Sequence, residues 1–151
     1  MPTAGVKVNE ATGHFEMVYN PEFFAGLSDE HRAGVLKHEF YHLLFEHVTG
    51  RMPEEVKGDF AGKGKLWNYA TDLAINSTIP RSELPEGGLI PGVPMNLEKC
   101  KEVLPKKDYD NAVKLSDFIE KLPRNKASEW YMEQLQDRKS TRLNSSHRCI
   151  S

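Results

Sequence analysis

The sequence has few of the features that mark several common protein classes. Its 151 residues include only two cysteines, Cys100 and Cys149, at a separation that suits no cysteine metal site and no disulfide framework. No apolar run approaches the ~18 residues of a membrane-spanning helix. The N-terminus lacks the basic region and apolar stretch of a signal peptide. We therefore expect a globular protein with a cytoplasmic location, no disulfide framework and no membrane partner.

The chain also has little excess of either charge, with a formal net charge of −2. Residues 137–151, DRKSTRLNSSHRCIS, match a translated short-read sequencing adapter at every position, and we interpret them as a non-native tail. The tail holds four basic residues and one acid, so without it 16 basic and 21 acidic residues give a net charge of −5. A mildly acidic chain without a basic stripe argues against nucleic acid as a partner. We expect one domain over residues 1–136, the N-terminal part of a longer protein.

The residue pattern predicts strands first and helices afterwards. Residues 6–20 carry β-branched and aromatic residues on both sides of a turn near 11–13, which predicts a β-hairpin. Ser28 followed by two acids predicts the start of a helix over residues 28–49. Its apolar residues are expected to pack on the core: Val35, Leu36, Leu43, Leu44 and Phe45. Further helices are predicted over 66–79, 97–104, 115–122 and 127–136.

The most informative pattern lies in the helix over 28–49 and reads His38-Glu39-Phe40-Tyr41-His42. Residues four apart share one face of a helix, so His38 and His42 can direct two imidazole nitrogens at one metal ion. A bound Zn²⁺ lowers the pKa of its water towards ~7, and Glu39 can take the proton of that water and pass it to a leaving amine. The pattern also arises by chance in roughly one or two chains in a hundred with this many histidines.

A metal site of this kind needs a third protein ligand. On a continuing helix His47 would face away from both histidines, so it is not that ligand. Glu46 lies one turn beyond His42, where it either orients an imidazole or is a solvated charge. The two remaining histidines of the body of the chain are expected at the surface: His14 and His31.

The helix over 66–79 offers another candidate. Asn68, Asp72 and Asn76 follow one another at intervals of four, which makes a polar stripe. Such a stripe is usually the wet face of an amphipathic helix. This helix, however, carries apolar residues around most of its circumference, and a buried aspartate needs a strong partner. Asp72 would complete a His-His-Asp site if it faced His38 and His42, with Asn68 and Asn76 forming local hydrogen bonds.

Two segments together resemble a known family. The stretch YNPEFFAGLSDEHRAGVLKHEFYHLLFEH, followed by LWNYATDLAIN, resembles the metallopeptidase domain that precedes a von Willebrand A-like domain in bacterial, archaeal and phage proteins. That family pairs HExxH with Trp-Asn-x-Ala-x-Asp-x-x-Ile-Asn, and the second motif corresponds here to residues 67–76. The resemblance spans about residues 4–136. It implies a zincin-type fold with Asp72 as the third ligand, and a von Willebrand A-like part that would follow this chain.

These observations predict an α+β, zincin-like domain with an N-terminal β-hairpin, an active-site helix and a second ligand-bearing helix. We expect a zinc peptidase acting on a peptide or protein, with Zn²⁺ held by His38, His42 and Asp72 and with Glu39 as general base. The alternative is a catalytically inactive, zinc-stabilised interaction module of a larger assembly, associated with a von Willebrand A-like domain, an ATPase or a phage particle. Three tyrosines are weak candidates for stabilising an oxyanion, and none is assigned: Tyr41, Tyr69 and Tyr131.

Overall fold

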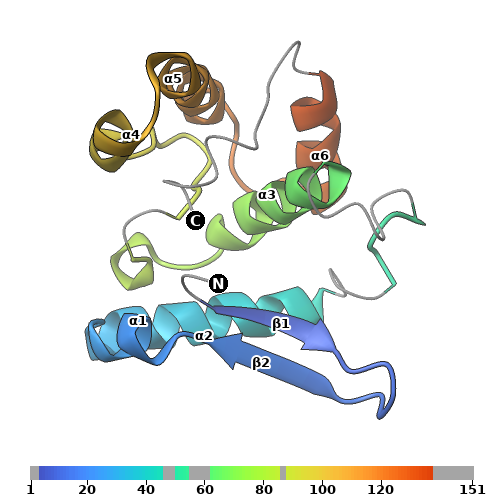
Figure 1. Ribbon diagram of the computed structural model, residues 1–151. Coiled ribbons are helices and arrows are strands. Elements are labelled where there is room, and N and C mark those ends of the chain that lie inside the picture. Colours follow the sequence, from blue (N-terminus) through green and yellow to red (C-terminus); the bar gives the residue numbers. More distant parts are fainter. Residues whose placement is uncertain (1–3, 46–49, 55–61, 86–87, 138–151) are drawn as a thin grey trace.

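The computed structural model describes residues 4–45, 50–54, 62–85 and 88–137. A two-stranded hairpin is followed by helices (Figure 1). In chain order the elements are β1 (Ala4–Val8), β2 (Phe15–Tyr19), α1 (Pro21–Ala25), α2 (Asp29–Leu44), α3 (Lys63–Asn76), the 3-10 helix η2 (Arg81–Glu83), α4 (Glu98–Val103), α5 (Lys106–Glu120) and α6 (Ser128–Asp137). This content is compatible with the predicted α+β class. The zincin-like assignment stays a prediction.

The predicted hairpin is confirmed. β1 pairs antiparallel with β2, with Ala4 opposite Tyr19 and Val8 opposite Phe15. Asn9 builds the turn, because its Oδ1 accepts hydrogen bonds from the backbone N–H groups of Ala11 and Thr12. Gly13 has a φ of 74°, a conformation in which glycine has no steric cost.

Helix α2 begins as predicted and ends earlier than predicted. The Ser28 hydroxyl accepts a hydrogen bond from the backbone N–H of His31, which caps the first turn. The helix ends at Leu44, not near residue 49. Arg51 donates from Nη1 to the carbonyl oxygen of Phe45 at 3.3 Å, so a side chain from outside the helix satisfies a carbonyl at its end. Residues 46–49 lie outside the described residues.

The later helices also depart from the predicted boundaries. α3 starts at Lys63 and ends at Asn76, where the hydroxyls of Ser77 and Thr78 bond to carbonyls of the last turn. α5 starts at Lys106, nine residues before the predicted 115. The first half of α5 is rich in charge, so its apolar pattern is weak there. The buried residues of the helix have helical spacing: Ala112, Leu115, Ser116 and Ile119.

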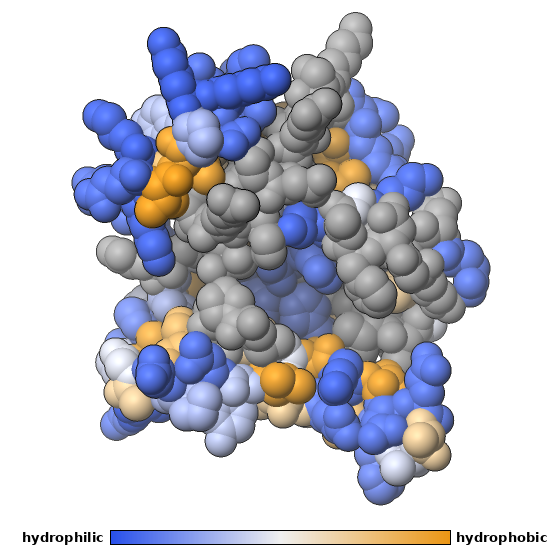
Figure 2. All heavy atoms as spheres, in the orientation of Figure 1, coloured by the Kyte–Doolittle hydropathy of each residue, from blue (hydrophilic) through white to orange (hydrophobic). Residues whose placement is uncertain are grey.

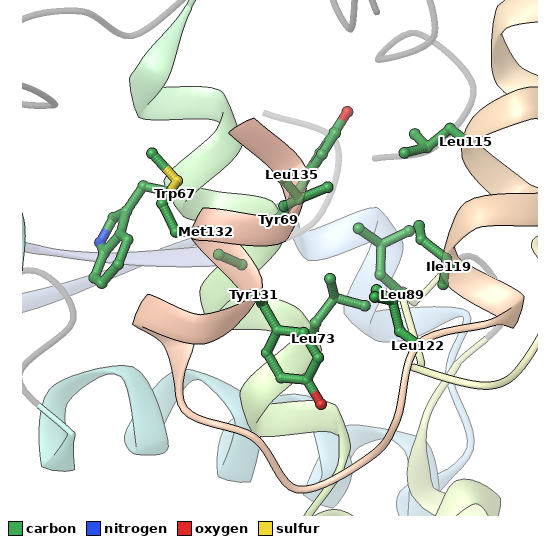
Figure 3. Close-up of a cluster of buried hydrophobic side chains, with 11 residues drawn as sticks. Trp67, Tyr69, Leu73, Leu89, Leu115, Ile119, Leu122, Tyr131, Met132 and Leu135 are labelled. Carbon is green, nitrogen blue, oxygen red and sulfur yellow. The ribbon is translucent and has the colours of Figure 1, made fainter. Parts of the chain in front are cut away.

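The main core lies between α3, α5 and α6, and α3 packs closely along α6 (Figure 3). Leu73 and Tyr131 are fully buried within it. A smaller cluster joins α4 to α5 through Cys100, Leu104 and Ala112. Cys100 is fully buried in this cluster.

Only part of α2 is covered. Val35 is buried, but Leu36 and Leu44 are exposed, which corrects the expectation that both pack on the core. Leu36, Phe40 and Leu44 lie at intervals of four, about 200° around the helix from His38 and His42, so they face away from α3. Among the described residues no helix combines the length and apolar character needed to cross a bilayer.

Candidate metal centre

The histidines of α2 and the aspartate of α3 meet where these two helices pack together. In Figure 1, α3 lies between α2 and the C-terminal helices. His38 and His42 stand one turn apart, with ring centroids 4.8 Å apart. Asp72 approaches both of them from α3. Its Oδ1 lies 2.9 Å from Nε2 of His38 and 3.1 Å from Nε2 of His42.

The three candidate ligand atoms form a nearly equilateral triangle. The two histidine Nε2 atoms are 3.1 Å apart, so every side measures 2.9 to 3.1 Å. Tetrahedral zinc with bonds of 2.0–2.1 Å places neighbouring ligand atoms about 3.3 Å apart. The donor set and its spacing therefore fit a zinc ion after shifts of a few tenths of an ångström. In the part of the chain that the structure describes, these are the His, Cys, Asp and Glu side chains that group in this way.

Charge attraction holds the metal-free site together. Burial lowers the pKa of His38, but the attraction and hydrogen bond of Asp72 outweigh it and raise the pKa from 6.5 to about 9. Burial raises the pKa of the Asp72 carboxyl, and the attraction and hydrogen bonds of His38 and His42 outweigh it, so the net shift is downward. At neutral pH without metal, an imidazolium therefore faces a carboxylate.

Glu39 lies between the two histidines in sequence and is buried, with 7% of its surface exposed. Burial raises the pKa of its carboxyl, and the attraction of His42 and His38 only partly offsets this. The Glu39 side chain forms no hydrogen bond with another described residue. The hydrogen bonds at this site join His38 to Asp72 and to Asn76. The charges of the two histidines therefore compensate the burial of this carboxylate only in part.

The two asparagines of the predicted polar stripe have different environments. Asn76 is buried, and its Oδ1 lies 2.7 Å from Nδ1 of His38 while its Nδ2 donates to the carbonyl oxygen of Leu89 at 2.8 Å. Asn68 is exposed at the surface of α3. The expectation of local hydrogen bonds is thus confirmed for the Asn76 side chain, whereas Asn68 contributes its backbone carbonyl, which accepts from Thr71.

The remaining candidates have different environments, and two of them lie outside the described residues. His14 is exposed on the hairpin turn and His31 is half-buried in the first turn of α2. Tyr131 donates its hydroxyl to the carbonyl of Pro123 in the core, and Tyr41 stacks on Phe45. Tyr69 is buried, and its hydroxyl has no hydrogen-bond partner among the described residues. Glu46 and His47 are not among the described residues.

Sequence reasoning missed the contact that sets the position of η2. The backbone of Glu83 lies against Gly34, so closely that a Cβ atom at Gly34 would stand 1.8 Å from the Glu83 carbonyl oxygen. Lys37 forms an ion pair with the Glu83 side chain at the same place. Gly34, His38 and His42 follow one another at intervals of four, so this contact and the ligand face share one side of α2. A glycine inside a helix lowers its stability, so Gly34 was the sequence feature that could have indicated a close contact at this position.

Figure 2 shows the surface of the molecule in the orientation of Figure 1. Hydrophilic residues line the floor of a hollow between the lower part, formed by the hairpin and α2, and the upper helices. The rim on the lower side carries apolar residues.

The chain was compared with known protein families, curated proteins and solved structures. A family model described as "Putative metallopeptidase domain" matches residues 2–148. The match therefore runs beyond residue 136, and the predicted domain boundary there stays a prediction. No significant match was found among curated proteins or among solved structures.

Proposed function

Because the chain belongs to the family described as "Putative metallopeptidase domain", we propose that it is a zinc-dependent peptidase of the HExxH type. In this proposal His38, His42 and Asp72 bind Zn²⁺, and Glu39 is the general base. One observation carries it: ligand atoms from two helices, 34 positions apart in sequence, lie 2.9 Å from each other beside a buried glutamate.

The donor set supports zinc as the metal. Two imidazole nitrogens and one carboxylate oxygen resemble the ligands of catalytic zinc sites, which keep the fourth position open for water or substrate. When bound, Zn²⁺ supplies a water of lowered pKa and polarises the carbonyl to be attacked. A site closed by four protein ligands would instead indicate a structural role.

The protein's own residues supply proton transfer and orientation. Glu39 accepts a proton from the attacking water and delivers it to the nitrogen of the departing amine. Burial raises the pKa of Glu39, and a carboxyl whose pKa is closer to neutrality is better matched to both steps. Asp72 contacts both imidazoles and so holds them converged on one point.

A peptide or protein is the substrate that this chemistry implies. β1 packs beside α2, so the hairpin lies close to the ligand-bearing helix (Figure 1). An extended peptide could pair with an edge of this hairpin as an added strand, with backbone hydrogen bonds that do not depend on its sequence.

A second candidate function is an interaction module stabilised by zinc. Exposed large apolar residues favour it, since seven of the eight that the described residues contain lie on the hairpin and α2: Phe15, Met17, Val18, Tyr19, Leu36, Phe40 and Leu44. Exposed apolar surface of this kind often marks contact with another protein. In such a module Glu39 would have no task.

Two variants of the full chain, compared with the unaltered protein, separate these functions. Metal content by mass spectrometry should give about one zinc per chain for the unaltered protein and for Glu39→Gln, and much less for Asp72→Ala. Digestion of a defined peptide library should then proceed with the unaltered protein and stop with Glu39→Gln. Zinc binding with no difference between these two in peptide cleavage would favour the interaction module. Zinc retained by Asp72→Ala would refute the ligand assignment.

A further inference from the structure

Both the oxygen and the NH₂ group of the Asn76 carboxamide form hydrogen bonds. The residue is the last of α3, one turn after Asp72, and only 2% of its surface is exposed. Its Nδ2 lies 2.8 Å from the Leu89 carbonyl oxygen, and its Oδ1 lies 2.7 Å from Nδ1 of His38. It therefore bridges a candidate metal ligand and the backbone of another segment.

The chemistry of these partners fixes the direction of each bond. A backbone carbonyl can only accept, so the Leu89 oxygen requires the NH₂ group of Asn76. The other end of the carboxamide is then the oxygen, which also can only accept. Nδ1 of His38 must therefore carry a proton. The orientation of the amide and the proton on Nδ1 both follow from one carbonyl group.

This arrangement leaves the other nitrogen of His38 for the metal. In a neutral imidazole with its proton on Nδ1, the lone pair is on Nε2. Nε2 is the atom that lies 2.9 Å from Asp72 and 3.1 Å from Nε2 of His42. A histidine of the opposite tautomer would present an N–H to the metal and would bind it poorly.

We infer that Asn76 is a positioning residue, which the Leu89 carbonyl orients and which in turn holds His38 with its proton on Nδ1 and Nε2 directed at the metal. The inference rests on the proposed zinc site and adds a residue to it. Residues in this position around metal ligands typically change metal affinity 10- to 100-fold when they are lost.

The chain offers a matched control. Asn68 is the same residue type on the same helix, two turns before Asn76, and it is exposed. Replacing either asparagine by leucine makes the same chemical change, so general effects on α3 appear in both variants. Only the change at residue 76 removes the acceptor for His38.

The experiment measures zinc affinity of the full chain by competition with a chromogenic chelator. Asn76→Leu should weaken zinc binding by about 10- to 100-fold, while Asn68→Leu should leave it within about twofold. Asn76→Asp keeps an acceptor for Nδ1 but cannot donate to the Leu89 carbonyl, so its zinc affinity should lie between those of Asn76→Leu and the unaltered protein. Equal affinities of the unaltered protein and a folded Asn76→Leu variant would overturn the inference and leave the zinc site standing. Failure of the unaltered protein to bind zinc would instead overturn the proposed function.

A second readout covers a variant that fails to fold. Two-dimensional ¹H–¹⁵N spectra of the imidazoles in the unaltered, zinc-loaded protein should show the proton of His38 on Nδ1. They should also show Nε2 with the shift of a metal-bound nitrogen. A proton on Nε2 would overturn the inference, whatever the variants do.

Discussion

Nε2 of His38 lies 2.9 Å from Oδ1 of Asp72, and this contact joins the two helices that form the candidate site. The contact brings two of the candidate ligands to one point. The same contact opposes metal binding at low pH, because a proton on Nε2 of His38 must leave before zinc can bind there. Metal-free and zinc-loaded protein should therefore respond to pH in opposite ways.

The first prediction concerns this response. In the folded, metal-free chain the pKa of His38 is about 9, against 6.5 for an ordinary histidine. The imidazolium thus stabilises the fold fully below pH 6.5, and this contribution is lost as the pH rises from 6.5 to 9. Thermal unfolding of the metal-free chain should show decreasing stability over this interval, by about 3 kcal/mol at most.

Zinc-loaded protein provides the contrast. Because zinc competes with protons for the histidines, its contribution to stability should increase over the same pH interval. The Asp72→Asn variant should show a flatter pH response without metal, since it removes the carboxylate that raises the pKa of His38. A metal-free stability that increases from pH 6.5 to 9 would contradict the charge pair.

The second prediction is that Glu39→Gln stabilises the metal-free protein while it abolishes peptide cleavage. Burial raises the pKa of Glu39 in the folded state, so the fold loses stability as the pH rises above 4.5 and the carboxyl ionises. Glutamine carries no charge and escapes this loss. The melting temperature at pH 7.5 should increase by a few degrees, and the difference should vanish near pH 4.

Glu30→Gln is the matched control for Glu39→Gln. Glu30 is exposed in the first turn of the same helix, where a negative charge interacts favourably with the helix dipole. Its replacement should leave stability unchanged or slightly lower. A gain of equal size in both variants would show that the effect comes from net charge and not from burial at residue 39.

The third prediction is that Gly34→Ala destabilises the protein. A Cβ atom there would overlap the Glu83 carbonyl, so α2 and η2 must separate. Overpacking of this kind costs about 1–3 kcal/mol, more than the ~1 kcal/mol that alanine gains in helix propensity. Urea unfolding measures the change. Gly26→Ala should alter stability by less than about 0.5 kcal/mol, because its nearest neighbours would lie 3.6 Å and 3.7 Å away.

The fourth prediction contrasts two leucines. Leu73 is fully buried between α3 and the C-terminal helices, beside Asp72 in sequence, whereas Leu36 is 50% exposed. Leu73→Ala should cost about 3–5 kcal/mol through lost burial and a cavity, and Leu36→Ala less than about 0.5 kcal/mol. Urea unfolding of the metal-free chain compares them. Similar losses would mean that the exposed face of α2 is covered in solution.

Several features followed from local rules and were predictable. The hairpin turn depends on Asn9 and Gly13, which bond or bend within a few residues of themselves. The start of α2 depends on Ser28, three residues from the N–H it caps. The end of α2 was not predictable in this way. It involves Arg51, whose approach to Phe45 depends on the path of the chain after the helix.

The sequence by itself determined that His38 and His42 share one side of a helix with Glu39 next to them, because that spacing is a property of the helix alone. Only the tertiary structure decided which residues of α3 meet them. Asn68, Asp72 and Asn76 form one polar stripe in the sequence, and their spacing alone does not say which of them faces α2. Each step of four residues turns about 40° around the helix, so Asn68 and Asn76 point about 80° apart. Packing of α3 across α2 exposes Asn68, places Asp72 against both histidines, and buries Asn76 between His38 and Leu89.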